Sequence, residues 1–116
     1  MQLRNQEIMK RELDKQIFAL HADVCKILAN PKRLEILQIL RDNELMVTEI
    51  VDKIGANKAN ISQHLAIMRM KGILCQRREG QHIYYRVANN KVIQAFDLMR
   101  EVLFEQLSKH HDLVNK

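Results

Sequence analysis

The chain has 116 residues, of which 47% are hydrophobic and 28% charged, the composition of one globular domain with little room for a second core. It has no run of 18 apolar residues and no basic-then-apolar leader, so we expect neither a membrane span nor secretion. Its two cysteines, Cys25 and Cys75, form no CxxC pattern, which excludes a zinc finger and suits a reducing cytoplasm.

The net charge of +5 comes from one part of the chain. Residues 52–86 hold seven basic and two acidic side chains, whereas all other residues together hold twelve of each. A clustered positive charge is the electrostatic footprint of a protein that binds a polyanion. A soluble surface with uneven charge is the alternative interpretation of this feature.

Helical periodicity organises the first part of the chain. Residues 5–28 predict a helix with one apolar side. Asn30 and Pro31 predict the start of a second helix, because Asn caps helices and Pro fits the first helical position. That second helix, ended by Asn43, is apolar around much of its circumference and should be central to the core.

Residues 47–71 have the pattern of a helix-turn-helix. An apolar stripe ends at Ile54 and is followed by Gly55, a residue typical of helix ends. Asn57 is a candidate cap for the next helix, which should run from Lys58 to about Met70. Two short helices joined by a three-residue turn with a glycine form a helix-turn-helix. The buried stripe of the second helix is predicted to be Ile61, Leu65 and Met68.

After Gly72 the apolar period changes from 3.6 to 2. Residues 73–78 and 82–87 predict two strands of a hairpin with a basic tip, a wing over about residues 73–87. A last helix, capped by Asn89 or Asn90, is expected over residues 89–110. The predicted fold class is therefore mostly α with a β-hairpin wing, a winged helix-turn-helix in a single domain over residues 1–116.

The first and last predicted helices carry more apolar surface than three short helices can cover. Exposed patches of this kind promote association. We therefore expect a two-fold homodimer built on residues 5–28 and 89–110. The alternative is that these two helices pack on each other inside a monomer.

The second helix of the helix-turn-helix has an unusual outward face. Opposite its stripe lie small and short polar side chains, where solvating charges would be usual. Small residues let a helix enter the major groove, and Asn, Gln and Ser hydrogen-bond to base edges and phosphates there. We therefore expect DNA contacts from Asn57, Lys58, Ala59, Asn60, Ser62, Gln63 and His64.

Two parts of this predicted interface have a second interpretation. His64 lies on the flank of the stripe, so a half-buried structural histidine is as good an account as a phosphate contact. The wing would bring Arg77, Arg78, Gln81 and His82 to the DNA backbone or minor groove. Arg77 and Arg78 alternate to opposite faces, so only one need touch DNA. A solvated charged turn is the alternative for the wing tip.

Three segments, ANPKRLEILQIL, ELMVTEIVDKIGANKANISQHLAIMRMKGIL and RREGQHIYYRV, resemble the ArsR/SmtB family of bacterial winged-helix repressors. The resemblance covers roughly residues 15–108 and keeps the family's order and spacing. It implies an obligate homodimer built on the first and last helices, which represses by operator binding and is released by a metal or another inducer. Two-fold symmetry would match an inverted repeat in double-stranded DNA.

The sensor residues of the family do not carry over. Met46 and Thr48 stand where metalloid-sensing members have cysteines. The zinc site of other members would fall on Asn89, Lys91, Val102 and Glu105, and neither a lysine nor a valine can complete it. Gln38 stands near one position of the cysteine pair with which some members sense oxidants.

What remains for sensing is Cys25 and Cys75, whose default role is packing. Thiol chemistry at these two residues, with an oxidant, reactive sulfur or a thiophilic metal as inducer, is the first hypothesis for the signal. His21, His110 and His111 are weak candidates for a metal site at the dimer ends, where a frayed polar tail is the simpler account.

The leading functional hypothesis is a dimeric, sequence-specific DNA-binding regulator, a repressor released by an inducer. A constitutive regulator without a small-molecule signal is one alternative, and a winged-helix adaptor that binds a protein is another. The charge cluster argues against the adaptor. An enzyme is a poor fit, because the sequence has no nucleophile with an oriented base, no phosphate loop and no complete metal site.

Overall fold

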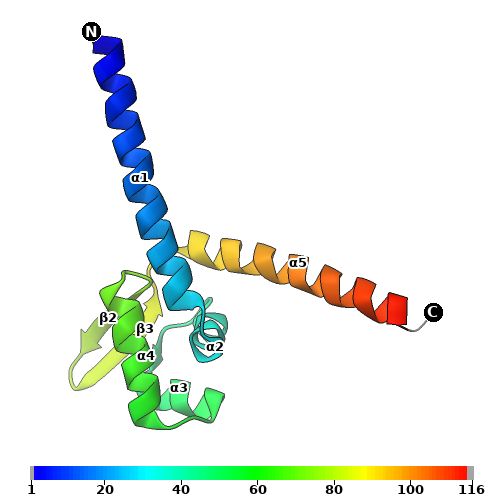
Figure 1. The fold of residues 1–116 in the computed structure, drawn as a ribbon. Coiled ribbons are helices and arrows are strands. Elements are labelled where there is room, and N and C mark those ends of the chain that lie inside the picture. Colours follow the sequence, from blue (N-terminus) through cyan, green and yellow to red (C-terminus); the bar gives the residue numbers. More distant parts are fainter. Residues whose placement is uncertain (1, 115–116) are drawn as a thin grey trace.

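The computed structural model describes residues 2–114, with side chains described as far as His111. Figure 1 shows a small body made of α2, α3, α4 and a sheet, from which α1 and α5 project in different directions. This is the predicted winged helix-turn-helix. In chain order the elements are α1 (Gln2–Leu28), α2 (Pro31–Ile39), β1 (Leu45–Met46), α3 (Val47–Ile54), α4 (Lys58–Met70), β2 (Leu74–Glu79), β3 (His82–Val87) and α5 (Asn90–Val114).

The predicted helix boundaries of the body follow from local capping. The Asn30 Oδ1 atom accepts hydrogen bonds from the backbone N–H groups of Lys32 and Arg33, at 2.9 and 3.2 Å, and Pro31 is the first residue of α2. Gly55 ends α3 with a φ of 74°, a conformation that glycine adopts without steric cost. These boundaries confirm the predictions made at Asn30, Pro31 and Gly55.

The core of the body is formed where α4 packs on α2 and α3. The predicted stripe of α4 is confirmed, because Ile61, Leu65 and Met68 each have 0% of their surface exposed. They meet fully buried side chains of the two preceding helices. Those partners are Ile36, Leu37 and Leu40 around α2 and Ile50 in α3.

The sheet has three antiparallel strands in the order β1-β3-β2. The wing strands pair from Leu74 opposite Val87 to Glu79 opposite His82. The first strand runs one residue later than the predicted 73–78, because the backbone N–H of Ile73 donates to the carbonyl oxygen of Met68 at the end of α4, at 3.0 Å. The short strand β1 was not predicted, since two residues are too few to show a period.

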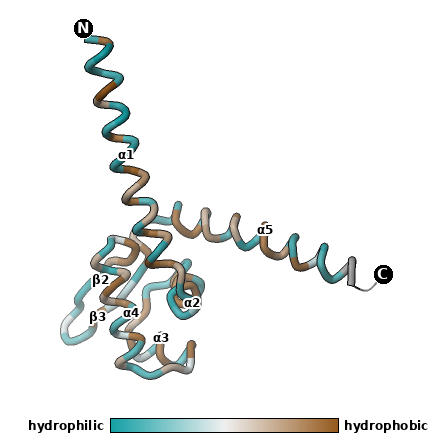
Figure 2. Tube along the Cα trace, in the orientation of Figure 1, coloured by the Kyte–Doolittle hydropathy of each residue, from teal (hydrophilic) through white to brown (hydrophobic). Residues whose placement is uncertain are grey.

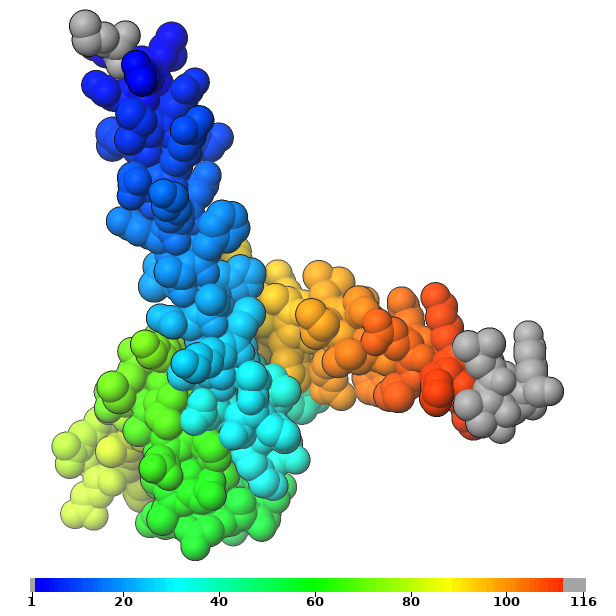
Figure 3. Space-filling model, in the orientation of Figure 1, coloured from blue at the N-terminus to red at the C-terminus, as the bar shows by residue number. Residues whose placement is uncertain are grey.

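The two projecting helices are longer than predicted, beginning at Gln2 for α1 and ending at Val114 for α5. No residue of α1 is buried. The radius of gyration is 18.7 Å, whereas a compact domain of this length would have roughly 13 Å. Figure 3 shows both helices standing away from the body. The alternative in which they pack on each other inside one chain is therefore wrong.

Both projecting helices have apolar residues along their length, as the brown segments of the tube in Figure 2 show. Leu3, Phe18, Leu98 and Leu107 are each more than 60% exposed. Within residues 2–114, no helix combines the length and apolar character needed to cross a membrane.

Candidate nucleic-acid interface

The outward face of α4 is a surface of small and short polar side chains. The residues predicted to read DNA from this face, Lys58, Ala59, Asn60, Ser62 and Gln63, are all exposed. Their backbone is held by the fully buried stripe on the opposite side of the helix. The face is therefore rigidly mounted and open, as direct contact with base edges requires.

Asn57 has a structural role at the start of α4. Its Oδ1 atom accepts hydrogen bonds from the N–H groups of Ala59 and Asn60, at 2.7 and 3.3 Å. This capping confirms the predicted start of the helix. It leaves the Asn57 amide nitrogen as the group that can donate to DNA.

His64 connects α4 to the other helices instead of lying on the open face. Its Nδ1 atom accepts a hydrogen bond of 3.0 Å from Arg33 Nε, and Arg33 Nη1 donates to the carbonyl oxygen of Ile27 at 3.0 Å. The ring is half-buried. Burial lowers the pKa of His64, and the Arg33 charge lowers it further. The geometry supports the structural interpretation, with His64 Nε2 left for a phosphate contact.

The two neighbouring arginines of β2 have different surroundings. Arg77 donates to Glu44 Oε1 from Nε and Nη2, at 2.9 and 2.6 Å, and to Glu79 Oε2 from Nη1, at 2.7 Å. Its guanidinium carbon also lies 4.8 Å from the centre of the Tyr84 ring. These hydrogen bonds raise the pKa of Arg77 above its ordinary value and lower that of Glu44. The donors of Arg77 are thus used in contacts within the chain.

Arg78 is the arginine that the wing presents outward. It is exposed, and its one hydrogen bond among the described residues is from Nε to the carbonyl oxygen of Gly80, at 3.2 Å. Gln81 and His82 are also exposed at the tip. The predicted alternation is therefore present, and the tip offers a cation and two hydrogen-bonding side chains.

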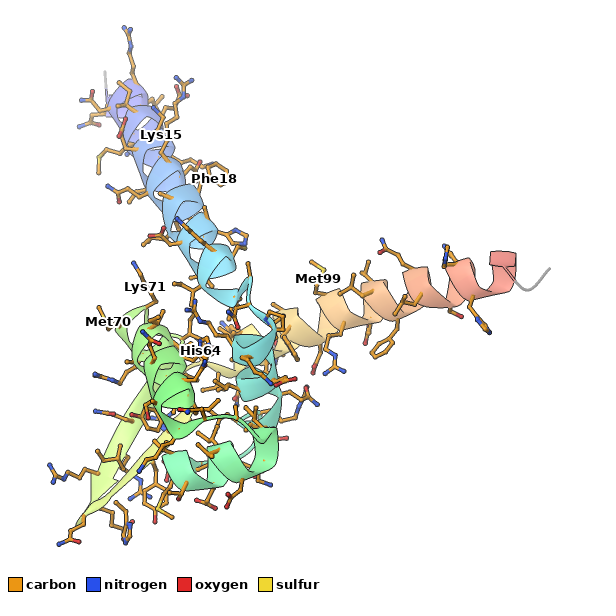
Figure 4. All side chains as sticks on the ribbon, turned by 60° about the horizontal axis from the view of Figure 1, so that its bottom comes forward. Lys15, Phe18, His64, Met70, Lys71 and Met99 are labelled. Atoms are coloured by element: carbon orange, nitrogen blue, oxygen red, sulfur yellow. The ribbon has the colours of Figure 1, made fainter. Side chains whose placement is uncertain are left out.

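Arg69, in the last turn of α4, was not among the predicted DNA contacts. It is exposed and lies seven residues after Ser62, so helical geometry puts both on one face. That spacing was the available signal. Lys71, one residue beyond the helix, instead lies 3.9 Å from Asp23 of α1. Figure 4 shows Lys71 and Met70 at the end of α4 that approaches α1.

The candidate sensing residues are not gathered in one place. Cys25 is exposed on α1, so packing inside the chain does not explain it, whereas Cys75 is half-buried in β2. His21 lies on α1 and His110 and His111 lie near the end of α5, and these helices diverge (Figure 1). Among the described residues no three His, Cys, Asp or Glu side chains are grouped as a metal site requires.

Comparison with known proteins gives one consistent result. Residues 30–74 match the family described as "Bacterial regulatory protein, arsR family". The chain is 35% identical over 77 residues to the transcriptional activator HlyU of Vibrio cholerae, an alignment that covers 66% of this chain and 71% of HlyU.

Solved structures agree with this match. The homodimeric winged helix-turn-helix DNA-binding domain Mb0332 of Mycobacterium bovis, a possible ArsR-family regulator, superposes with a TM-score of 0.76 at 36% identity, covering 84% of this chain and 91% of that one. The transcriptional repressor PagR of Bacillus anthracis gives a TM-score of 0.67 at 34% identity, covering 73% of this chain and 98% of PagR. The chain belongs to the ArsR family and is a DNA-binding transcriptional regulator, not an enzyme.

Proposed function

We propose that the protein is a homodimer that binds an inverted-repeat operator. Each protomer places its α4 helix and its wing on one half-site. The observation that carries this proposal is the open face of α4, where Asn60, Ser62 and Gln63 are exposed beside small residues. Asn and Gln can pair bidentately with adenine, and Ser with several acceptors. Arg78 would bind phosphate at the edge of each half-site.

The homodimer is supported by the two projecting helices. Ile17 and Phe18 of α1 and Met99 and Leu103 of α5 are between 49% and 71% exposed. Figure 4 shows Phe18 and Met99 on the sides of their helices that face the open angle between α1 and α5. Apolar rows of this size are buried in association, and Mb0332, a structural relative, is named as homodimeric. A second copy of the chain would cover both rows.

The regulator is expected to repress and to be released by an inducer. Among its relatives, PagR is named a repressor and HlyU an activator. A transcription assay with the purified protein tests whether it represses or activates transcription. Thiol chemistry is the candidate signal. Cys25 is exposed, and Cys75 is the Cα partner of Arg86 across the wing, which gives the Cys75 thiol a neighbouring cation.

The first test is fluorescence anisotropy with the reduced protein and the duplex upstream of its own coding region. We expect tight binding to an inverted repeat and weak binding to a single half-site. Gln63→Ala should cost about 1–3 kcal/mol on the operator and relax its sequence preference. Gln94→Ala, an exposed glutamine on α5, is the control. Equal losses on operator and random duplex would remove Gln63 from the base-reading residues.

The thiol signal is tested by repeating this measurement after treatment with an oxidant, a persulfide or a thiophilic metal. Loss of operator binding in the native protein, with binding retained in the Cys25→Ser, Cys75→Ser double variant, is the expected result. If the double variant responds like the native protein, thiol chemistry is not the signal.

A further inference from the structure

A cavity of about 520 Å³ opens between α2, α3 and α5. Its volume lies within the range of small-molecule sites, which are mostly apolar with a few polar groups. Neither cysteine lines it, and none of the predicted DNA-reading residues does. Its apolar lining consists of Pro31, Leu34, Ile39, Ile54 and Phe96, and its polar lining of Glu35, Gln38, Lys53 and Arg100.

The charged groups of the cavity favour an anion. Lys53, at the end of α3, makes no ion pair with any residue from 2 to 111. Glu35 is the one carboxylate in the lining, and it already accepts a hydrogen bond from Lys32 Nζ, at 3.4 Å. Lys32 does not line the cavity. The negative charge of Glu35 is therefore paired with a cation outside the lining, whereas the lining itself contains two cations, Lys53 and Arg100.

The second cation, Arg100, makes no ion pair among the described residues, although its charge, after the effect of Arg41, also helps to lower the pKa of the nearby Asp97. Its Nη1 atom donates to Gln38 Oε1 at 2.8 Å, and its guanidinium carbon lies 5.4 and 5.5 Å from the ring centres of Phe96 and Phe104. The nearby Asp97 is bound instead by Arg41, at 2.6 and 2.9 Å. A guanidinium fixed by neutral groups keeps donors for an incoming carboxylate.

We propose that this cavity binds an amphipathic organic acid, with its carboxylate on Lys53 and Arg100 and its apolar body against Leu34, Ile39 and Phe96. One wall, Lys53 and Ile54, directly precedes the Gly55 turn that leads into α4. Phe96 and Arg100 of α5 line another part of the cavity. An acid bound between these two parts joins the dimerisation helix to the helix-turn-helix, so it is an effector that changes the placement of α4. This last step rests on the proposed function, whereas binding of the acid does not.

The test uses three probes that share an eight-carbon tail: octanoate, 1-octanol and octylammonium. Each is titrated into ¹⁵N-labelled full-length protein, and amide shifts locate the site. Octanoate should shift the amides of α2 from Leu34 to Ile39, of Lys53 and Ile54, and of Phe96 to Arg100. Octylammonium should leave them unchanged, because it meets two like charges, and 1-octanol should bind more weakly than octanoate.

Variants decide whether the cavity carries this binding. Lys53→Gln should weaken octanoate binding about tenfold, the usual effect of losing one charged hydrogen bond. Lys53 is exposed, so the fold should not change. Leu34→Trp should block the cavity, and Lys91→Gln, which removes an exposed lysine of α5 outside the lining, is the matched control.

Three outcomes would overturn the proposal. Octylammonium could bind as well as octanoate, the shifts could fall on α1 and on the part of α5 beyond Arg100, or the cavity amides could stay unchanged because the partner subunit covers them. Operator binding by the unliganded protein is measured separately. If the protein does not bind the operator but octanoate binds in the cavity, the proposed function is wrong and the site remains. If the protein binds the operator but octanoate does not bind in the cavity, only the site is wrong.

Discussion

The body and the two projecting helices differ in how far they bury their apolar side chains, although their compositions are similar. In the body, apolar side chains such as Ile50 and Leu65 have 0% of their surface exposed. In α1 no side chain is buried, and Leu3 is 77% exposed. Both regions form helices, so helix formation alone does not create a core. The body buries its apolar side chains in one core, whereas the apolar rows of the projecting helices stay exposed in the single chain.

The largest expected effect is on the free energy of unfolding, and it comes from a substitution in the core of the body. Leu65→Ala should lower the free energy of unfolding by about 2–5 kcal/mol, because it removes buried methyl groups and leaves a cavity. Lys10→Ala, at an exposed polar position of α1, should change it by less than about 0.5 kcal/mol. Urea denaturation followed by circular dichroism measures both. Equal effects would mean that the two regions form one core.

The next effect concerns the helices and leaves the body intact. Leu103→Glu puts a charge into the apolar row of α5 and should weaken dimerisation about a hundredfold or more, because two unpaired carboxylates would be buried together. Sedimentation equilibrium measures the dissociation constant. Gln94→Glu adds the same charge nine residues earlier, on the opposite face of the helix, and should leave it unchanged. A dimer that survives Leu103→Glu would show that α5 is not in the interface.

A smaller effect distinguishes the two arginines of the wing. Arg78→Ala should weaken binding to every duplex and reduce the slope of log K against log salt by about one unit, because one phosphate contact is lost. Arg77→Ala should leave the slope unchanged, since Glu44 and Glu79 already bind that guanidinium. An unchanged slope in Arg78→Ala would place the wing away from phosphate.

The smallest effect is a pH dependence from His64. Burial and the Arg33 charge lower its pKa, so the folded state favours the neutral ring. The stabilisation is present above the unfolded pKa of about 6.5 and is lost as the pH falls. His64→Asn keeps an acceptor near the Nδ1 position but does not titrate. Its unfolding free energy should fall less between pH 7 and 5 than that of the native protein. His82→Asn, at the exposed wing tip, should behave like the native protein.

Local signals predicted the body of the fold because their causes lie within a few residues. Asn30, Asn57 and Gly55 act on backbone groups two to four positions away, and each ends or starts a helix where predicted. The burial of Ile61, Leu65 and Met68 follows from helical period alone. The same period predicted that apolar rows on the first and last helices would exceed what the body could cover.

Contacts between distant residues could not be predicted in this way. Glu44 and Arg77 are 33 positions apart, and Arg33 and His64 are 31 apart. Each pair depends on where two elements meet. These pairings decide that Arg78 is the outward arginine of the wing and that His64 ties α4 to α2.

The amino-acid sequence by itself determined the helices and the two wing strands, the buried stripe of α4, the position of the positive charge and the family. The tertiary structure decided which polar side chains bind other residues of the chain and which are exposed to solvent. It also formed the cavity, whose lining comes from α2, α3 and α5. The physical reason is range: capping and periodicity act within one or two helical turns, whereas a site is made of side chains that only packing brings together.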